Sequence, residues 1–148
     1  MQVELVHKSK FQFESRIREH VTIMDTKESA GGDNAGPTPK ELMLASVLGC
    51  TGMDIVAVLK KYRIIPRKLV LKGDAEPRSA HPRVFNSIQI IFEAEDDAIT
   101  SEMLINAAHE SMTKFCGVSA MVSKVVPIYY KVILNGTEVG HGQAKFDI

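Results

Sequence analysis

The first 25 residues alternate between apolar and polar side chains, which is the pattern of half-buried β-strands. The alternating apolar positions are Val3, Leu5, Phe11, Phe13, Val21 and Ile23. Turns are expected over residues 8–10 and 17–20. Residues 26–38, TKESAGGDNAGPT, are rich in glycine and small polar residues, so this stretch is predicted to be a loop.

A long helix is predicted to begin at Thr38 and to end near Tyr62. Thr is a preferred N-cap, Pro39 suits the first helical position, and Glu41 completes a capping box. Positions 42–59 are almost wholly apolar and have about the length of a short membrane span. Asp54, near the centre, would be costly in lipid. We therefore expect a helix buried in the protein or in a subunit interface, and no membrane partner.

The second half of the chain predicts a mixture of strands and helices. Alternation predicts strands over residues 68–74, 85–94 and 128–134. Helical spacing of apolar residues predicts helices over residues 100–115 and 118–126. Cys116-Gly117 separates these two helices, and Asn135-Gly136 is a strong hairpin-turn signal.

The order of the predicted elements indicates the fold class. Strands come first, then the long helix, two strands, a helix and a further strand. Segregated runs of this kind favour an α+β fold with antiparallel sheets over a doubly wound parallel sheet. We expect a single domain over residues 1–148 and assign no role to residues 137–148.

Composition and charge are those of an ordinary globular protein. Of the 148 residues, 45% are hydrophobic and 24% are charged. The 18 basic and 18 acidic residues balance, so nothing points to a nucleic-acid partner, and a zero net charge favours self-association. The N-terminal residues lack the apolar segment of a signal peptide, and only two cysteines occur. A cytoplasmic location with free thiols is expected.

The two cysteines are the candidate chemistry. Cys50 lies within the long helix on the same face as Ser46 and Asp54, since residues four apart share a helix face. Cys116 lies at the start of the short second helix, where free backbone N–H groups favour a thiolate. Taken alone, each cysteine is better explained as a small packed hydrophobe. No Cys/His spacing predicts zinc and the Gly-rich loop lacks a phosphate-binding spacing, so no metal or cofactor is expected.

Taken together, the surroundings of the two cysteines resemble a known family. GGDNAGPTPKELMLASVLGCTGMDIVAVLKK is similar to the first signature of the OsmC/Ohr proteins, with a Gly-rich loop, a Pro-rich helix start and a Gly-Cys. KFCGVSAMVSKVVPIYYKV is similar to the second, a Cys before a small-residue helix and a Val-Pro strand entry. The resemblance extends from about Glu19 to Leu134, and GPTPKELMLASVLGC is closer to the OsmC-like branch than to the Ohr branch.

The resemblance implies a thiol peroxidase. The family's fold is an intertwined homodimer in which long central apolar helices pack against antiparallel sheets. Carried over, Cys50 is the peroxidatic thiol that a hydroperoxide oxidises to a sulfenic acid, and Cys116 resolves it as an intramolecular disulfide. A dithiol reductant then reopens the disulfide. The rival hypothesis is a non-catalytic dimeric protein of the same fold that binds a small apolar ligand.

The resemblance implies two further catalytic residues, and each of them also has a non-catalytic explanation. The best-characterised branch has a Glu ten residues before its first cysteine, paired with an Arg from the N-terminal region. Here Lys40 occupies that position, and Glu41 follows it. Glu41 is therefore a catalytic candidate, although its capping role already explains it. Arg18, or else Arg16, is the candidate guanidinium that activates the thiolate, and either also fits an ordinary solvated strand residue.

Overall fold

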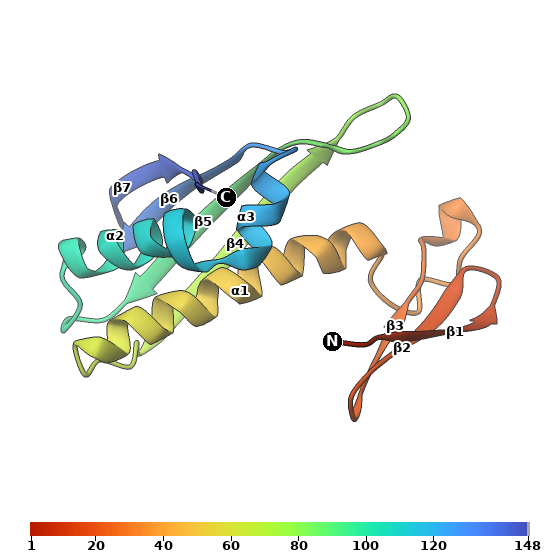
Figure 1. Ribbon diagram of the computed structural model, residues 1–148, viewed down its shortest axis with the longest axis horizontal. Helices are drawn as coiled ribbons and strands as arrows, with labels where there is room; N and C mark the ends of the chain where they lie inside the picture. The colour runs from red at the N-terminus through yellow and green to blue at the C-terminus, as the bar shows by residue number, and fades with distance from the viewer. Residues whose placement is uncertain (148) are drawn as a thin grey trace. The chain divides into compact units, whose positions relative to one another are not determined.

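The computed structural model describes residues 1–147 and divides into two compact units, Met1–Leu44 and Ala45–Ile148, of which residue 148 is not described. The first unit holds strands β1 (Glu4–Ser9), β2 (Gln12–Ile17) and β3 (His20–Met24) in one antiparallel sheet (Figure 1). The three strands and their turns confirm the alternation pattern. The expectation of a single domain over the whole chain stays a prediction.

The predicted loop after β3 is organised by one buried carboxylate. Asp25 is 3% exposed and accepts hydrogen bonds from the backbone N–H groups of Thr26, Asp33 and Ala35, at 2.7, 3.0 and 3.1 Å. These bonds, the Ala35 one foremost, lower the pKa of Asp25. Three backbone donors of the loop are thus used by the protein's own carboxylate.

Helix α1 (Pro39–Lys61) begins with the predicted capping box. The backbone N–H and hydroxyl of Thr38 donate to Glu41 Oε2 at 2.7 and 2.9 Å, and the Glu41 N–H returns a bond of 3.4 Å to Thr38 Oγ1. One face of the helix is buried, at Val47, Thr51, Ile55, Val58 and Leu59. By length and composition α1 would also cross a membrane, and within the chain only 28% of its most apolar window is buried.

The second unit is built on a four-stranded sheet in the order β4 (Lys68–Pro77), β5 (Phe85–Glu95), β6 (Ile128–Leu134) and β7 (Thr137–Gln143). The prediction of antiparallel sheets is wrong for one pair, because β5 and β6 run parallel. The reason is the helical crossover between them. It returns the chain to the end of the sheet at which β5 began, so β6 runs in the same direction as β5. Asn135 and Gly136 both have positive φ, 49° and 81°, as a tight β6–β7 hairpin requires.

The crossover consists of α2 (Ser101–Glu110), a π-helical turn over Ser111–Phe115, and α3 (Gly117–Ser123) (Figure 1). The interruption at Cys116 confirms the predicted break, although the sequence pattern did not reveal that the last turn of the predicted helix is π-helical. The core lies between the crossover and the sheet. Its fully buried large side chains include Ile88, Ile90, Phe92, Leu104, Met112, Ile128 and Val132.

Candidate active site

Helix α1 supplies one wall of the candidate site. At Gly52 the helix faces β4, where a Cβ would make ordinary van der Waals contact, 3.5 Å, with both δ carbons of Leu71. Thr51 is fully buried, while Cys50 and Asp54 are half-buried. The four-residue spacing predicted that Cys50 and Asp54 share a face, and they do lie together.

The segment around Cys116 supplies the other wall. The π-helical turn closes with a bond of 3.1 Å from the Cys116 N–H to the Ser111 carbonyl, and Cys116 then leaves the helix with extended backbone (φ −70°, ψ 95°). From this position it is the N-cap of α3, and its Sγ accepts a bond of 3.3 Å from the Ser119 N–H. The side chain of Cys116 is completely buried.

Thr51 connects the two walls. Its Oγ1 lies 2.9 Å from the Val47 carbonyl oxygen, 3.4 Å from Cys116 Sγ and 3.5 Å from Ser119 Oγ. The hydroxyl has a single proton, so it donates to the helix carbonyl or to the sulfur, one at a time. The Cys116 sulfur thus has two protein donors within reach. The Ser119 N–H bonds to it, and the Thr51 hydroxyl can turn to it from the Val47 carbonyl.

The two cysteines meet in this space. Cys50 Sγ, Cys116 Sγ and a carboxylate oxygen of Asp54 all lie within 4.8 Å of one another. Both cysteines are free thiols. Folding therefore brings together, within one chain, two thiols that are distant in the sequence. A disulfide needs the sulfurs at about 2.05 Å, so its formation requires both side chains to move toward each other.

The environment of Cys50 favours its neutral thiol. Burial raises the pKa of Cys50, and a hydrogen bond with the Cys116 thiol and the negative charge of Asp54 raise it further. The backbone N–H of Val118 opposes this by bonding to the sulfur and lowering the pKa. In the part of the chain that the structure describes, no cation is among the groups that shift the pKa of Cys50.

Asp54 is held in place from the crossover. The Ser111 hydroxyl donates a hydrogen bond of 2.8 Å to Asp54 Oδ2. Beside this carboxylate a hollow of about 320 Å³ is lined by Asp54, Ala57, Val58, Lys61 and Phe115. The Lys61 ammonium lies 5.4 Å from the centre of the Phe115 ring, a cation–π distance. Three of the lining residues are apolar, and Asp54 and Lys61 are charged.

Comparison with known proteins places the chain in a family. Residues 31–131 match the family model described as OsmC-like protein. The chain belongs to the OsmC-like family. Protein YhfA of Escherichia coli K12 is 31% identical over 109 residues, which cover 74% of this chain and 78% of YhfA.

Two solved structures share the fold of this OsmC-like protein. A hypothetical protein from Aquifex aeolicus VF5 has a TM-score of 0.80 and 24% identity, over 99% of this chain and 97% of that one. An organic hydroperoxide resistance protein OsmC from Legionella pneumophila has a TM-score of 0.60 and 15% identity, over 90% and 94% of the two chains. The resemblance to OsmC/Ohr proteins is confirmed.

The other predicted site residues of this OsmC-like protein lie in its first unit. Arg18 is exposed in the β2–β3 turn, with φ 56°. Arg16 pairs with Glu14 at 2.7 Å. Glu41 is exposed and engaged in the capping box, where the backbone N–H and then the hydroxyl of Thr38 lower its pKa. The catalytic roles of Arg18 and Glu41 stay predictions.

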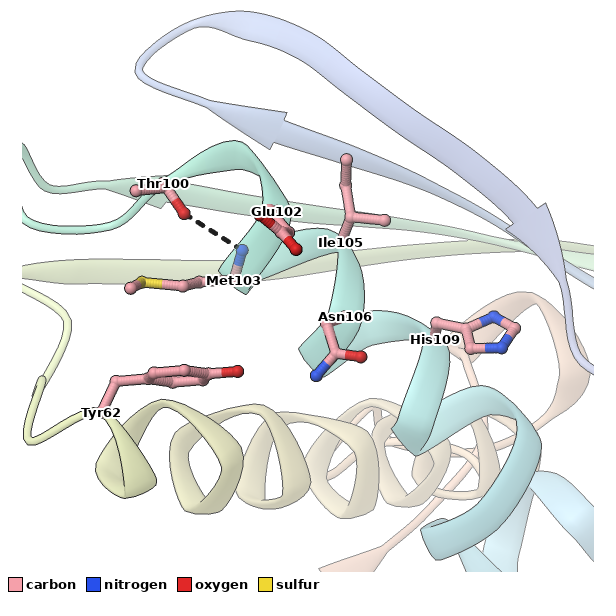
Figure 2. Close-up of a pocket in the computed structure, with 7 residues that line it drawn as sticks. All are labelled: Tyr62, Thr100, Glu102, Met103, Ile105, Asn106 and His109. Carbon is pink, nitrogen blue, oxygen red and sulfur yellow. Dashed lines mark hydrogen bonds between the residues drawn. The ribbon is translucent and has the colours of Figure 1, made fainter.

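A larger concavity lies elsewhere in the second unit. It has a volume of about 800 Å³ and lies between Tyr62, after the end of α1, and α2 (Figure 2). Its lining residues are Tyr62, Thr100, Glu102, Met103, Ile105, Asn106 and His109. One hydrogen bond within it, from the Met103 N–H to Thr100 Oγ1 at 3.3 Å, caps α2. The concavity contains none of the four predicted site residues.

Three hydroxyl-bearing residues at the thiol site were missed from the sequence. Thr51, Ser111 and Ser119 are each fully buried. A signal for Ser119 was present, because the third residue after an N-cap is the one whose N–H the cap accepts. No spacing rule connects Ser111 with Asp54, since their contact depends on how the crossover packs on α1.

Proposed function

We propose that this protein is a cysteine-dependent peroxidase that reduces organic hydroperoxides, with Cys50 as the peroxidatic thiol and Cys116 as the resolving thiol. The observation that carries the proposal is the approach of two free thiols from distant parts of the chain to within 4.8 Å. The burial of the two cysteines agrees with these roles, because the peroxidatic thiol must be reached by the substrate and the resolving thiol need not be. Cys50 is accessible to a small substrate, whereas Cys116 is sealed beneath it.

The first chemical step oxidises Cys50. Its thiolate attacks one oxygen of the O–O bond, an S–O bond forms, and the departing alkoxide takes a proton to become an alcohol. Cys50 is then a sulfenic acid, and the peroxide has gained two electrons. The apolar hollow lined by Ala57, Val58 and Phe115 supports a substrate with a hydrophobic alkyl group.

The second step closes the disulfide. The Cys116 thiolate attacks the Cys50 sulfur, an S–S bond forms, and hydroxide leaves and is protonated to water. The Ser119 N–H and the Thr51 hydroxyl are placed to stabilise that attacking thiolate. A dithiol reductant then returns both thiols by disulfide exchange. Two free thiols suit a reducing compartment, and we propose a cytoplasmic location.

The proposed active form is a homodimer. Several large apolar side chains of α1 and of the segment from α3 to β6 are exposed in the single chain, namely Met53 at 75%, Val56 at 39%, Met121 at 67% and Val125 at 74%. Met53 and Val56 lie on the uncovered face of α1, and a second copy would shield them from water. Such a dimer would also place a second copy of Arg18 in the assembly. Light scattering at micromolar concentration checks this proposal, and a monomeric mass would contradict it.

Peroxide consumption tests the proposed activity directly. The reduced protein is mixed with cumene hydroperoxide, tert-butyl hydroperoxide or hydrogen peroxide, each with a panel of dithiol reductants. We expect catalytic turnover, faster with the alkyl peroxides than with hydrogen peroxide. If neither cysteine is oxidised by stoichiometric peroxide, the rival hypothesis of a non-catalytic protein that binds a small apolar ligand is favoured instead.

A further inference from the structure

The two sulfurs and the carboxylate form a set of metal-ligand atoms. Cys50 and Asp54 are four residues apart on α1, the spacing at which one helix presents two ligands to the same ion. Cys116 supplies a third ligand from the opposite wall, and the three ligand atoms lie within 4.8 Å of one another. We propose that Cys50, Asp54 and Cys116 form a binding site for Zn²⁺ in the reduced protein.

The geometry is close to that of a zinc site. Tetrahedral zinc with Zn–S bonds of about 2.3 Å holds two thiolates about 3.8 Å apart. The two sulfurs lie within 4.8 Å of each other, so their separation must shorten by about 1 Å or less, which side-chain rotation can provide. Three protein ligands leave the fourth position for water, as in zinc sites with an open coordination position.

The surrounding groups orient these ligands as a second shell does. The Ser111 hydroxyl bonds to Asp54 Oδ2 at 2.8 Å, which leaves the other carboxylate oxygen for the ion. Cys116 Sγ receives the Ser119 N–H at 3.3 Å, and the Thr51 hydroxyl lies 3.4 Å away. Donors of this kind hold a thiolate ligand in place and partly offset its charge.

The ligand types select the ion. Two thiolates favour zinc and other thiophilic metals over Mg²⁺ and Ca²⁺, which prefer oxygen ligands. Binding releases the two thiol protons, and the two thiolates and the carboxylate together bring three negative charges to the dication. Neither sulfur changes its oxidation state in this step.

Metal binding and disulfide formation exclude each other, because both use the same two sulfurs. Zinc would hold the thiols reduced and shield them from peroxide, and a disulfide would expel the ion. The metal site requires only the reduced thiols and does not depend on the proposed peroxidase activity. The two proposals are therefore tested separately.

Cobalt is the spectroscopic probe for this site. Metal-free, reduced, full-length protein is titrated with Co²⁺ under anaerobic conditions. We expect a near-ultraviolet thiolate-to-cobalt band that saturates at one ion per chain and disappears when one equivalent of Zn²⁺ is added. Prior oxidation to the disulfide should prevent the band, and reduction should restore it. Absence of the band from the reduced protein would overturn the proposal.

Variants identify the ligands. Cys50→Ser and Cys116→Ser should each lose the band of a two-thiolate site, and Asp54→Asn should weaken binding by roughly tenfold or more. Asp97→Asn is the matched control, because Asp97 is exposed in the turn before α2. An Asp54→Asn affinity equal to that of the control would overturn the three-ligand site. Circular dichroism checks the fold of each variant.

A second measurement needs no substitution. Zn²⁺ should protect Cys50, the thiol that is half-exposed, from alkylation by iodoacetamide in the unmodified protein, and a chelator should restore its reactivity. Equal alkylation with and without Zn²⁺ would overturn the site even if a variant failed to fold. Peroxide consumption by the metal-free protein is measured in parallel, so that loss of the metal site and loss of the proposed activity give different results.

Discussion

The Ser111 hydroxyl donates a hydrogen bond of 2.8 Å to the Asp54 carboxylate, across the junction between α1 and the π-helical turn. This bond holds a negative charge beside the Cys50 and Cys116 sulfurs. The charge opposes ionisation of Cys50.

Replacement of Asp54 by Asn should make Cys50 more reactive. Asp54 is one of the causes that raise the pKa of Cys50, after burial and the Cys116 thiol. Removal of the charge lowers that pKa, so more thiolate exists at neutral pH. We expect iodoacetamide to alkylate Cys50 roughly threefold faster in Asp54→Asn than in the unmodified protein or in Asp97→Asn. A slower rate in Asp54→Asn would show that the carboxylate promotes ionisation.

The two cysteines should fail in different ways when replaced. Cys50→Ser should abolish peroxide consumption, because the nucleophile is lost. Cys116→Ser should complete the first oxidation and then accumulate Cys50 sulfinic acid, because no thiol traps the sulfenic acid. Mass spectrometry after stoichiometric peroxide distinguishes these products. Oxidation of Cys116 in the Cys50→Ser variant at the rate of the unmodified protein would reverse the assignment.

Thr51→Val should slow disulfide closure and leave the first oxidation unchanged. The substitution removes a hydroxyl 3.4 Å from Cys116 Sγ and keeps a side chain of similar shape. Loss of a donor to the attacking thiolate should slow closure by roughly tenfold. Thr113→Val is the matched control, since Thr113 makes the same kind of bond to the His109 carbonyl, at 2.8 Å. Rapid-quench trapping of the sulfenic acid measures closure, and equal rates in both variants would exclude the role.

Arg18 should matter more for activity than Glu41. A guanidinium beside Cys50 would stabilise its thiolate, so Arg18→Ala should slow peroxide attack by roughly tenfold or more. Glu41→Gln keeps an acceptor for the Thr38 N–H and should leave the rate within about twofold. Arg16→Ala tests the alternative arginine. A loss in Glu41→Gln equal to that in Arg18→Ala would contradict this ranking.

The pH dependence of Cys50 alkylation distinguishes two effects on the pKa of Cys50, that of the residues around it in the second unit and that of Arg18. In Arg18→Ala, burial, Cys116 and Asp54 should keep the pKa of Cys50 above the usual value of about 8.5, so alkylation rises only at more alkaline pH. In the unmodified protein Arg18 should move this rise to lower pH. Identical pH profiles of alkylation would exclude activation by Arg18.

The same raised pKa affects stability. In Arg18→Ala the folded state favours the neutral thiol, so this contribution is complete below about pH 8.5, the unfolded pKa, and is lost as pH rises through the folded pKa of Cys50. The additional variant Arg18→Ala/Cys50→Ser lacks this contribution. The difference in melting temperature between the two variants should therefore change over the alkaline range and stay constant at lower pH.

Local patterns predicted most of the secondary structure. The alternation around Phe11 and Phe13, the capping box of Thr38 and Glu41, and the Asn135-Gly136 turn each act over a few residues, so their consequences are visible in the sequence. The β5–β6 pairing was mispredicted as antiparallel for the opposite reason. Strand direction there depends on how the crossover packs on the sheet, which is not a local property.

The sequence by itself determined the strand and helix positions, the family resemblance and the candidacy of Cys50 and Cys116, because each depends on residue type and short-range spacing. Only the tertiary structure decided that the two sulfurs and the Asp54 carboxylate share one space, that Cys116 is buried while Cys50 is half-exposed, and that Ser111 holds the carboxylate. These relations join segments far apart in the chain. They arise from packing of the crossover against α1, which no local spacing encodes.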